Sequence, residues 1–470
     1  MTEPEVFDVV VLGAGPAGEN IAQYATQHTD LTAALIEREL VGGECSYYAC
    51  MPSKALLRPI EIAATSAHLS GLTPATLDRD ALLARRDLWV SRYDDSGQVK
   101  WADGAGLKVL RGTGRLIGER LVSLETTDET RTIEARHTVV IATGSEPVVP
   151  EMYADCAPWG SRDATGVVEV PDRLIIVGGG VVACEAAVWM SALGSSVTLL
   201  SRDDRLLTRV EPFASEIVLK ALRDMGIDVR VGVAVTGCRR DNARYTGLGH
   251  VHGGPVVLST DSGNIGVDEI LVAVGRHPRF DDIGLETVGL DAAKARAGDV
   301  PSWLVLVGDS SGEAPLTHWG KYRARVLGEQ IAARATGGTE VPPPDDVPVP
   351  QVIFTDPQVA AVGLTEAEAR AAHIDVEVTH VPWSAASGAA LLRDDVEGGA
   401  QLVIDRASRR VVGATFVGPE AGELLHSATI AITGRVPIEV LRHAVPSYPT
   451  ASELWLRLIE QLPVELLQPK

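Results

Sequence analysis

Two cysteines with four residues between them, Cys45 and Cys50, carry the most distinctive chemistry in the sequence. Two glycines precede the pair and Pro-Ser-Lys follows it, a spacing that suits one turn at the start of a helix with both sulfurs on the same side. There the thiols can close a small disulfide or open to a dithiol, and a helix N-terminus stabilises a thiolate. The alternative is two unrelated buried cysteines, because free cysteine packs as a small hydrophobic residue.

The segment before the cysteines predicts a dinucleotide-binding unit. A buried strand over residues 7–12 leads into a G-x-G-x-x-G turn, a helix from Glu19 and a second strand over 32–36. Such a turn lets a pyrophosphate approach the backbone at a helix N-terminus. Glu37 follows nineteen residues after Gly18, where a carboxylate binds a ribose hydroxyl. The glycines of the turn are Gly13, Gly15 and Gly18.

A second unit of the same kind lies further along the chain. A strand over 173–177 leads into a G-x-G-x-x-A turn over 178–183, then a helix, and a strand over 197–200 follows. Its two turn glycines are Gly178 and Gly180. The chain thus carries two predicted nucleotide-binding units, an internal repeat of function.

The residues after the last of these strands bear on which nicotinamide cofactor binds. Ser201 stands where an NAD site places an acid, and Arg202 and Arg205 follow. An acid there would repel a 2′-phosphate, whereas arginine pairs with it, so the sequence favours NADPH over NADH. A solvated surface arginine is the alternative, because Asp203 and Asp204 also lie close.

The segment from Gly42 to Lys54 resembles the active-site segment of the class I flavoprotein disulfide reductases, most closely of the dihydrolipoamide dehydrogenase and mercuric reductase type. Most members read Leu-Asn-Val-Gly between the cysteines, and this chain reads Ser-Tyr-Tyr-Ala. The resemblance covers nearly the whole chain. It implies an α/β fold with two Rossmann-like dinucleotide-binding domains and a C-terminal α+β dimerisation domain. The implied domains are FAD-binding, 1–150 and 270–340; NAD(P)-binding, 151–269; and dimerisation, 348–470.

The resemblance also implies an electron relay and its residues. Hydride passes from NADPH, or NADH, to FAD and then to the cysteine pair, with Cys50 nearest the flavin and Cys45 meeting the acceptor. Lys54 sits near the flavin and pairs with Glu185; the alternative is a surface lysine and a helix-face acid. Asp309 binds the ribityl chain of FAD. Other implied cofactor contacts are Gly13, Gly15, Gly18, Glu37, Gly43, Gly114, Thr143, Gly144, Gly275, Gly308, Leu316, Thr317 and His318 for FAD, and Gly178, Gly180, Ser201 and Arg202 for the nicotinamide nucleotide.

The C-terminal segment departs from the family pattern. The disulfide reductases carry His-Pro-Thr-x-x-Glu, whose histidine acts on the dithiol of the partner subunit in a homodimer. Here Tyr448 occupies the histidine position, Glu453 keeps the acid, and His443 lies five residues earlier. A phenol with a pKa of about 10 is a poor base near neutrality. Losing proton-transfer help costs a factor of roughly 10²–10⁴, which argues against a fast lipoamide or glutathione reductase.

The length, net charge and cysteine count of the chain argue against several classes of binding partner and location. The chain has 470 residues, enough for several domains, and a formal net charge of −21, which argues against nucleic acid and anionic membranes. Five cysteines in a chain of this length do not make a secreted disulfide framework, and neither a signal peptide nor a membrane span is predicted. We expect a cytoplasmic protein without a metal site.

The leading prediction is an FAD-dependent, NADPH-oxidising enzyme with a redox-active Cys45–Cys50 disulfide. Its small-molecule electron acceptor is an unusual disulfide or a non-thiol acceptor such as a quinone, which would not use the thiols. The alternative from another class is a redox-sensing flavoprotein with little turnover.

Overall fold

The computed structural model describes residues 3–468, which form two compact units built from separate stretches of chain. The first unit contains the chain up to Pro52, Arg86–Val148 and Gly275–Asp345. The second contains Ser53–Arg85, Val149–Val274 and the chain from Asp346 onward.

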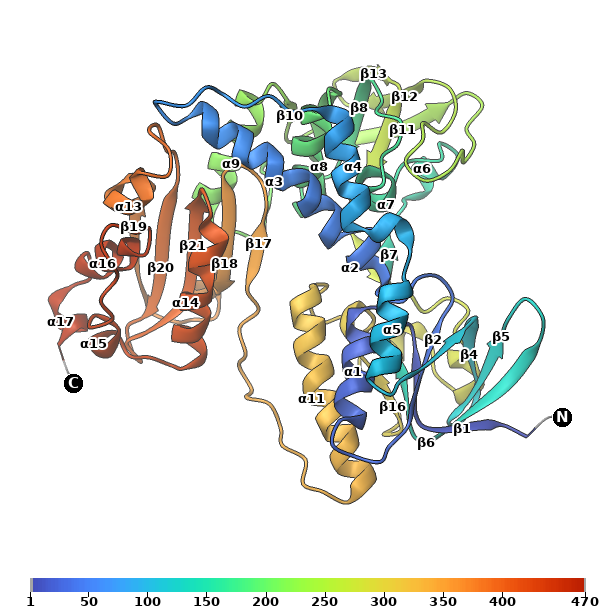
Figure 1. The fold of residues 1–470 in the computed structure, drawn as a ribbon. Coiled ribbons are helices and arrows are strands. Elements are labelled where there is room, and N and C mark those ends of the chain that lie inside the picture. The colour runs from blue at the N-terminus through green and yellow to red at the C-terminus, as the bar shows by residue number, and fades with distance from the viewer. Residues whose placement is uncertain (1–2, 469–470) are drawn as a thin grey trace. The chain divides into compact units, whose positions relative to one another are not determined.

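A seven-stranded sheet forms the centre of the first unit (Figure 1). Its strand β1 pairs in parallel with β2 and β6. Helices α1 (Pro16–Thr26) and α11 (Thr317–Thr336) lie side by side. Gly328 allows this close approach, because a Cβ there would lie 2.7 Å from the Cβ of Tyr24. In spatial order the strands are β3 (Lys108–Arg111), β2 (Ala33–Glu37), β1 (Glu5–Leu12), β6 (Thr130–Ile141), β5 (Leu121–Glu125) and β4 (Thr113–Gly118), with β16 (Leu304–Leu306) also paired to β6.

The turn from β1 into α1 has the conformation that the glycine pattern predicts. Gly13 has φ of 100°, and a Cβ there would lie 2.4 Å from the carbonyl oxygen of Ala142. A Cβ at Gly18 would lie 2.0 Å from the carbonyl oxygen of Gly13. Only glycine fits both positions, so the tight strand-turn-helix follows directly from the sequence.

The second unit contains the other nucleotide-binding fold. Its four-stranded parallel sheet packs against α8 (Val181–Ala192) and α9 (Pro212–Asp224), and three antiparallel strands adjoin it. The parallel strands are β10 (Asp228–Arg230), β9 (Ser196–Leu200), β8 (Arg173–Val177) and β14 (Glu269–Val272); the antiparallel strands are β11 (Val235–Arg240), β12 (Val256–Thr260) and β13 (Gly263–Val267).

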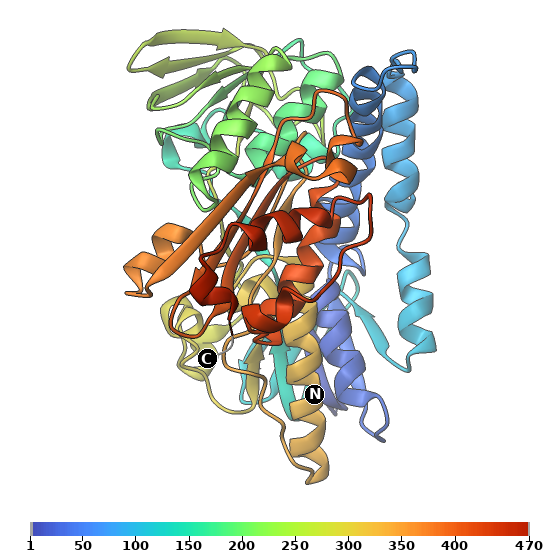
Figure 2. The same cartoon turned by 90° about the vertical axis from the view of Figure 1, so that its left-hand side faces the viewer.

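The C-terminal part of the second unit is a five-stranded antiparallel sheet crossed by helices, drawn orange to red in Figure 2. Trp383 and Phe416 are fully buried in its core, against helices α14 (Ala421–Thr433) and α16 (Glu453–Glu460). The strands in spatial order are β17 (Gln351–Ile353), β18 (Gln358–Gly363), β21 (Arg410–Gly418), β20 (Gly399–Asp405) and β19 (Val376–Pro382). The predicted fold class is therefore confirmed.

Two helices follow from Cys50 onward. Helices α3 (Cys50–Ala67) and α4 (Arg79–Trp89) are separated by irregular chain, in which Gly71 adopts φ of 95°. No helix within residues 3–468 has the length and apolarity to cross a membrane. The remaining helices and strands are α2 (Gly43–Tyr47), α5 (Ser96–Gly104), β7 (Ser145–Pro147), α6 (Glu151–Ala154), α7 (Ser161–Thr165), β15 (Arg276–Pro278), α10 (Ala292–Arg296), α12 (Glu366–Ala371), α13 (Ser387–Ala390), α15 (Ile438–Leu441) and α17 (Val464–Leu467), with short 3₁₀ turns at Ser91–Tyr93, Leu285–Val288, Gly308–Ser311 and Trp383–Ala385.

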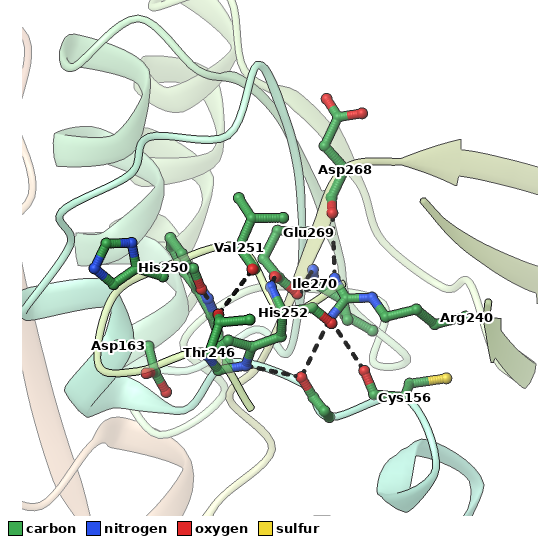
Figure 3. Close-up of polar contacts among 12 residues, drawn as sticks. Cys156, Asp163, Arg240, Thr246, His250, Val251, His252, Asp268, Glu269 and Ile270 are labelled. Atoms are coloured by element: carbon green, nitrogen blue, oxygen red, sulfur yellow. Dashed lines mark hydrogen bonds and ion pairs between the residues drawn. The ribbon is translucent and has the colours of Figure 1, made fainter. Parts of the chain in front are cut away.

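A fully buried ion pair joins β11 to β14 in the second unit (Figure 3). The guanidinium of Arg240 bonds to the Glu269 carboxylate and also donates to the carbonyl oxygens of Cys156 at 3.1 Å and His252 at 2.9 Å. The other carboxylate oxygen of Glu269 accepts from the backbone N–H of His252 at 2.8 Å. The pair therefore fixes the path of the loop between β11 and β12.

We expect Glu269→Ala to lower the free energy of unfolding by about 3–5 kcal/mol, because it leaves the Arg240 charge buried without its partner. Urea denaturation followed by circular dichroism measures the change. Arg173→Ala, which removes a more exposed ion pair with Asp268 at 2.6 Å, is the matched control and should lower the stability far less. Equal losses in the two variants would contradict this account of the buried pair.

Candidate active site

The two cysteines lie on two consecutive helices and not on one turn, which corrects the expected geometry. Cys45 is in the five-residue helix α2, and Cys50 is the first residue of α3. The helical path breaks at Tyr48, which has φ of −128°. A Cβ at Gly43 would lie 2.7 Å from the Cα of Gly15, so α2 rests directly on the first nucleotide-binding turn.

The two thiols are close to each other. A hydrogen bond to Cys50 is the largest cause that raises the pKa of the Cys45 thiol, and burial raises it further. The Thr317 hydroxyl and the Lys321 ammonium lower this pKa. The Sγ of Cys50 lies 3.3 Å from the hydroxyl oxygen of Thr317, at the N-terminus of α11. Cys50 also begins an 18-residue helix, whose positive end favours a thiolate. The arrangement suits a pair that alternates between disulfide and dithiol.

The two tyrosines between the cysteines have different surroundings. Tyr47 is 4% exposed and belongs to the core. Tyr48 is partly exposed and stacks on Tyr93, with ring centroids 5.5 Å apart and an interplanar angle of 29°. Tyr93 ends a 3₁₀ turn in which Ser91 and Arg92 also have positive φ. The stack therefore ties the break between α2 and α3 to a strained turn after α4.

Lys54 and Glu185 form the ion pair that the sequence predicts. The Nζ of Lys54 lies 2.7 Å from Oε2 of Glu185, whose side chain is only 5% exposed. The second carboxylate oxygen accepts from the backbone N–H of Phe354 at 2.9 Å, and the ring centroid of Phe354 lies 4.7 Å from Nζ. The carboxylate and the aromatic ring together hold the ammonium group in one place. The effect of the Lys54 ammonium group on a flavin stays a prediction.

The first nucleotide-binding turn has the features that an FAD adenosine site requires. Glu37 is fixed by backbone N–H groups, with Oε2 2.8 Å from Ala14 N and Oε1 2.8 Å from Glu39 N. Gly15 caps α1 and has nothing nearer than 3.9 Å to the position of a Cβ. A pyrophosphate can therefore approach the helix N-terminus, and the ribose can reach the carboxylate.

A chain of polar contacts links the cysteine helix to Asp309. Glu44 pairs with Arg276 at 3.3 Å, and Arg276 donates to the Ser145 hydroxyl at 2.8 Å and to the Ser145 carbonyl at 2.7 Å. The Ser145 hydroxyl in turn donates to Asp309 at 2.5 Å. Sequence reasoning missed Glu44, Ser145 and Arg276, although each directly follows a predicted site glycine.

The remaining predicted FAD contacts lie in the same unit. The hydroxyl of Thr143 donates to the carbonyl oxygen of Arg279 at 2.7 Å, and Gly144 accepts from the Arg279 N–H at 3.0 Å. Leu316 caps α11 and His318 is exposed in its first turn. Gly114 instead packs against the core, where a Cβ would lie 2.7 Å from Leu12. Positive φ values are found at Gly144, Gly275 and Gly308.

The second turn and the two arginines after it differ in their surroundings. Gly178 has φ of 133°, and a Cβ there would lie 2.3 Å from the Ala273 oxygen, while Gly180 caps α8 with open space around it. Ser201 is buried behind the turn. Arg205 donates to two carbonyl oxygens of its own loop, whereas the Arg202 side chain is 87% exposed.

The C-terminal residues lie in the second unit. Tyr448 is 76% exposed and His443 is also exposed. Glu453 is 5% exposed, and its Oε2 has no hydrogen-bond partner within residues 3–468. Their approach to Cys45 of a second subunit stays a prediction.

Comparisons with known proteins agree on one family. Residues 7–302 match the family model described as pyridine nucleotide-disulphide oxidoreductase, and residues 349–458 match its dimerisation domain. The chain is 32% identical to a dihydrolipoyl dehydrogenase of Haloferax volcanii, with 96% of this chain and 95% of that protein covered. It is 30% identical to a mercuric reductase of Shigella flexneri, with 95% and 79% covered.

The fold has a close counterpart among solved structures. The HOCl-induced flavoprotein disulfide reductase RclA of Escherichia coli, solved as a Cu(II) complex, superposes with a TM-score of 0.83. The superposition covers 98% of this chain and 100% of RclA at 22% identity, so it supports the fold.

We expect Arg276→Met to weaken FAD binding about 10-fold, because Ser145 and Asp309 lose the cation that orients them and a hydrogen bond to a charged group contributes roughly 1.5–3 kcal/mol. Fluorescence titration of the flavin-stripped protein with FAD measures the affinity. Arg115→Met is the matched control, because its partner Asp282 is 71% exposed. Unchanged FAD affinity in Arg276→Met would refute the proposed role of this contact chain.

Proposed function

The chain belongs to the pyridine nucleotide-disulphide oxidoreductase family and is an FAD-dependent oxidoreductase of disulfides, and we propose that it takes hydride from NADPH and passes the electrons out through Cys45 and Cys50. The observation that carries this proposal is the contact of the two thiols beside the hydroxyl of Thr317, with Cys50 at the start of a long helix.

The roles of the chain's own residues follow from their contacts. Bound FAD supplies two-electron transfer between a nicotinamide and a disulfide. Glu37 and Asp309 would hold its ribose and ribityl hydroxyls, and Lys54, which is fixed by Glu185, would supply the positive charge that the family resemblance assigns to the flavin. The Thr317 hydroxyl oxygen lies 3.3 Å from the Cys50 sulfur, where it would donate a hydrogen bond to the thiolate form.

NADPH is favoured over NADH by the surface after β9. Ser201 presents no carboxylate, and the Arg202 side chain is 87% exposed, with a long 3.9 Å contact to Asp203. A free guanidinium matches the bidentate geometry of a 2′-phosphate. Arg205 is less suitable, because its guanidinium already bonds to the carbonyl oxygens of Thr208 and Val210.

The presence of the family's dimerisation domain supports a homodimer in which Tyr448 and Glu453 of one subunit approach Cys45 of the other. We place the enzyme in the cytoplasm, because its few cysteines do not form a secreted disulfide framework. We also propose that the FAD-binding domain spans 1–150 and 270–340, the NAD(P)-binding domain 151–269 and the dimerisation domain 348–470.

A second candidate acceptor is a quinone. The observation that favours it is Tyr448, an exposed phenol where the family has a histidine that assists thiol exchange. A quinone can take electrons from the reduced flavin without any thiol base. A disulfide acceptor needs the Cys45 sulfur, whereas a quinone acceptor does not. Substitution of Cys45 therefore distinguishes the two acceptors.

We expect Cys45→Ser to abolish NADPH oxidation with lipoamide and to leave benzoquinone reduction within about twofold of the wild-type rate, because only disulfide exchange needs this sulfur. Absorbance of NADPH in paired assays measures both rates. Disulfide turnover that survives in Cys45→Ser would contradict the thiol relay. If the wild-type protein reduced benzoquinone but not lipoamide, its function would be quinone reduction instead.

We expect Arg202→Ala to lower kcat/KM for NADPH about 10-fold or more, since a charge-assisted hydrogen bond contributes roughly 1.5–3 kcal/mol, and to leave kcat/KM for NADH unchanged. Steady-state kinetics with each nucleotide measures the ratio. Arg209→Ala, an exposed arginine in the same loop, is the control. Equal effects on NADPH and NADH would show that Arg202 does not contact the 2′-phosphate.

A further inference from the structure

The turn after α4 holds three consecutive residues in a left-handed backbone conformation. Ser91, Arg92 and Tyr93 have φ of 51°, 53° and 60°, although none of them is glycine. Residues with a Cβ rarely adopt this conformation, and it persists only where the surrounding structure compensates for the strain. Strained backbone of this kind is common beside ligand sites, so the contacts of this turn bear on function.

The turn is fixed at both ends of helix α2, which carries Cys45. Before α2, the backbone N–H of Val41 donates to the Asp95 carboxylate at 2.7 Å. After α2, the ring of Tyr48 stacks on that of Tyr93, with centroids 5.5 Å apart and an interplanar angle of 29°. The strained turn therefore runs beside the cysteine helix, and its conformation presents the Tyr93 ring to Tyr48.

Tyr48 closes the helical turn that contains Cys45. Its backbone N–H donates to the carbonyl oxygen of Glu44 at 2.8 Å. Side chains three residues apart in such a turn are neighbours, with Cβ atoms about 5–6 Å apart, and a helical side chain leans over the turn before it. The Tyr48 ring thus lies on the face of α2 that carries the Cys45 thiol. Tyr48, Tyr93 and Cys45 are all partly exposed, so a small molecule at the thiol can contact the rings.

Two stacked phenol rings offer a flat aromatic surface, on which a further aromatic ring packs in an offset or edge-to-face arrangement. We propose that Tyr48 and Tyr93 form one wall of the acceptor site at Cys45, and that this wall favours disulfides that carry aromatic groups. This inference rests on the proposed thiol relay and adds to it the substrate class. Tyr93 is a specificity residue in this arrangement, and the strained turn is its support.

An aromatic disulfide also suits the C-terminal substitution of this chain. An aromatic thiol has a lower pKa than an aliphatic one, because its ring delocalises the negative charge of the thiolate, and a thiol of lower pKa leaves faster in exchange. Such a leaving group needs little help from a proton donor. The chain carries Tyr448 where the family has its histidine, so this class of acceptor places the smallest demand on the residue that is replaced.

The exchange balances in two steps. The Cys45 thiolate forms a bond to one acceptor sulfur, the acceptor S–S bond breaks, and one arylthiolate departs with the electron pair. The Cys50 thiolate then attacks the Cys45 sulfur, which closes the Cys45–Cys50 disulfide and releases the second arylthiolate. The two thiol protons pass to water. Hydride from NADPH, delivered through FAD, and one proton from water restore the dithiol.

The first test compares two acceptors in the FAD-loaded protein. It measures kcat/KM for dithiobisnitrobenzoate, an aromatic disulfide, and for lipoamide, an aliphatic one. In Tyr93→Leu the ratio of the aromatic to the aliphatic value should fall about 5-fold, the effect of one lost aromatic contact. Tyr93→Phe keeps the ring and should keep the ratio. Tyr48→Leu should lower the ratio as Tyr93→Leu does, which retains the test if one variant does not fold.

A second readout needs no turnover. The NADPH-reduced protein is alkylated with iodoacetanilide or iodoacetamide, which share a leaving group and differ by a phenyl ring, and peptide mass analysis gives the two rates at Cys45. The ratio of these rates does not depend on the ionisation of the thiol, because both reagents react with the same thiolate. It should fall about 5-fold in Tyr93→Leu. Tyr245→Leu, which removes a 69% exposed phenol from the second unit, should match the wild type.

The outcomes separate this inference from the proposed function. Unchanged ratios in Tyr93→Leu and Tyr48→Leu, together with a dead Cys45→Ser, would overturn the aromatic wall and leave the thiol relay standing. Equal losses with both acceptors, at an unchanged alkylation ratio, would assign the tyrosine stack a purely structural role and would also overturn the inference. Disulfide turnover that survives in Cys45→Ser would overturn the relay itself.

Discussion

The contact between two glycine backbones, Gly43 and Gly15, is the constraint on which the rest of the site depends. Any side chain at Gly43 would lie 2.7 Å from the Cα of Gly15, so helix α2 can rest on the nucleotide-binding turn only without one. This contact sets the position of Cys45 relative to the start of α1, and the helix start at Cys50 then directs the second sulfur toward Thr317. Backbone packing, more than any polar bond, fixes where the thiols lie.

Buried carboxyl groups in this chain differ in how completely they are hydrogen-bonded. In the second unit, Glu185 has a donor for each oxygen, from Lys54 and from the backbone of Phe354, and Glu269 is equally well paired with Arg240. In the first unit, Glu19 keeps one oxygen unpaired and its pKa is raised to about 7 by burial. Hydrogen bonds and ion pairs favour the ionised form of a buried carboxyl group, whereas burial by itself favours the neutral form.

Much of this arrangement could be predicted from the sequence. The glycine turns follow from a local pattern with strong geometric demands, since few residues other than glycine fit at Gly13 and Gly18. The Lys54–Glu185 pair joins residues far apart in the sequence and was implied only by the family resemblance. The break at Tyr48 between α2 and α3 could not be foreseen, because no proline or glycine marks it. The contacts of Ser145 with Arg276 and Asp309 could not be predicted from the sequence for a different reason. They join segments more than a hundred residues apart.

Glu19 shows how packing changes an acid whose local sequence looks ordinary. An acid in the first turn of a helix ordinarily complements the helix dipole, so the sequence offers a sufficient structural reason for it. Its pKa is nevertheless raised to about 7, because the helix buries the carboxyl group and the charges that act on it, Lys321 and Glu37, belong to other elements. The environment that raises this pKa is therefore a product of tertiary packing and does not follow from the residues next to Glu19 in the sequence.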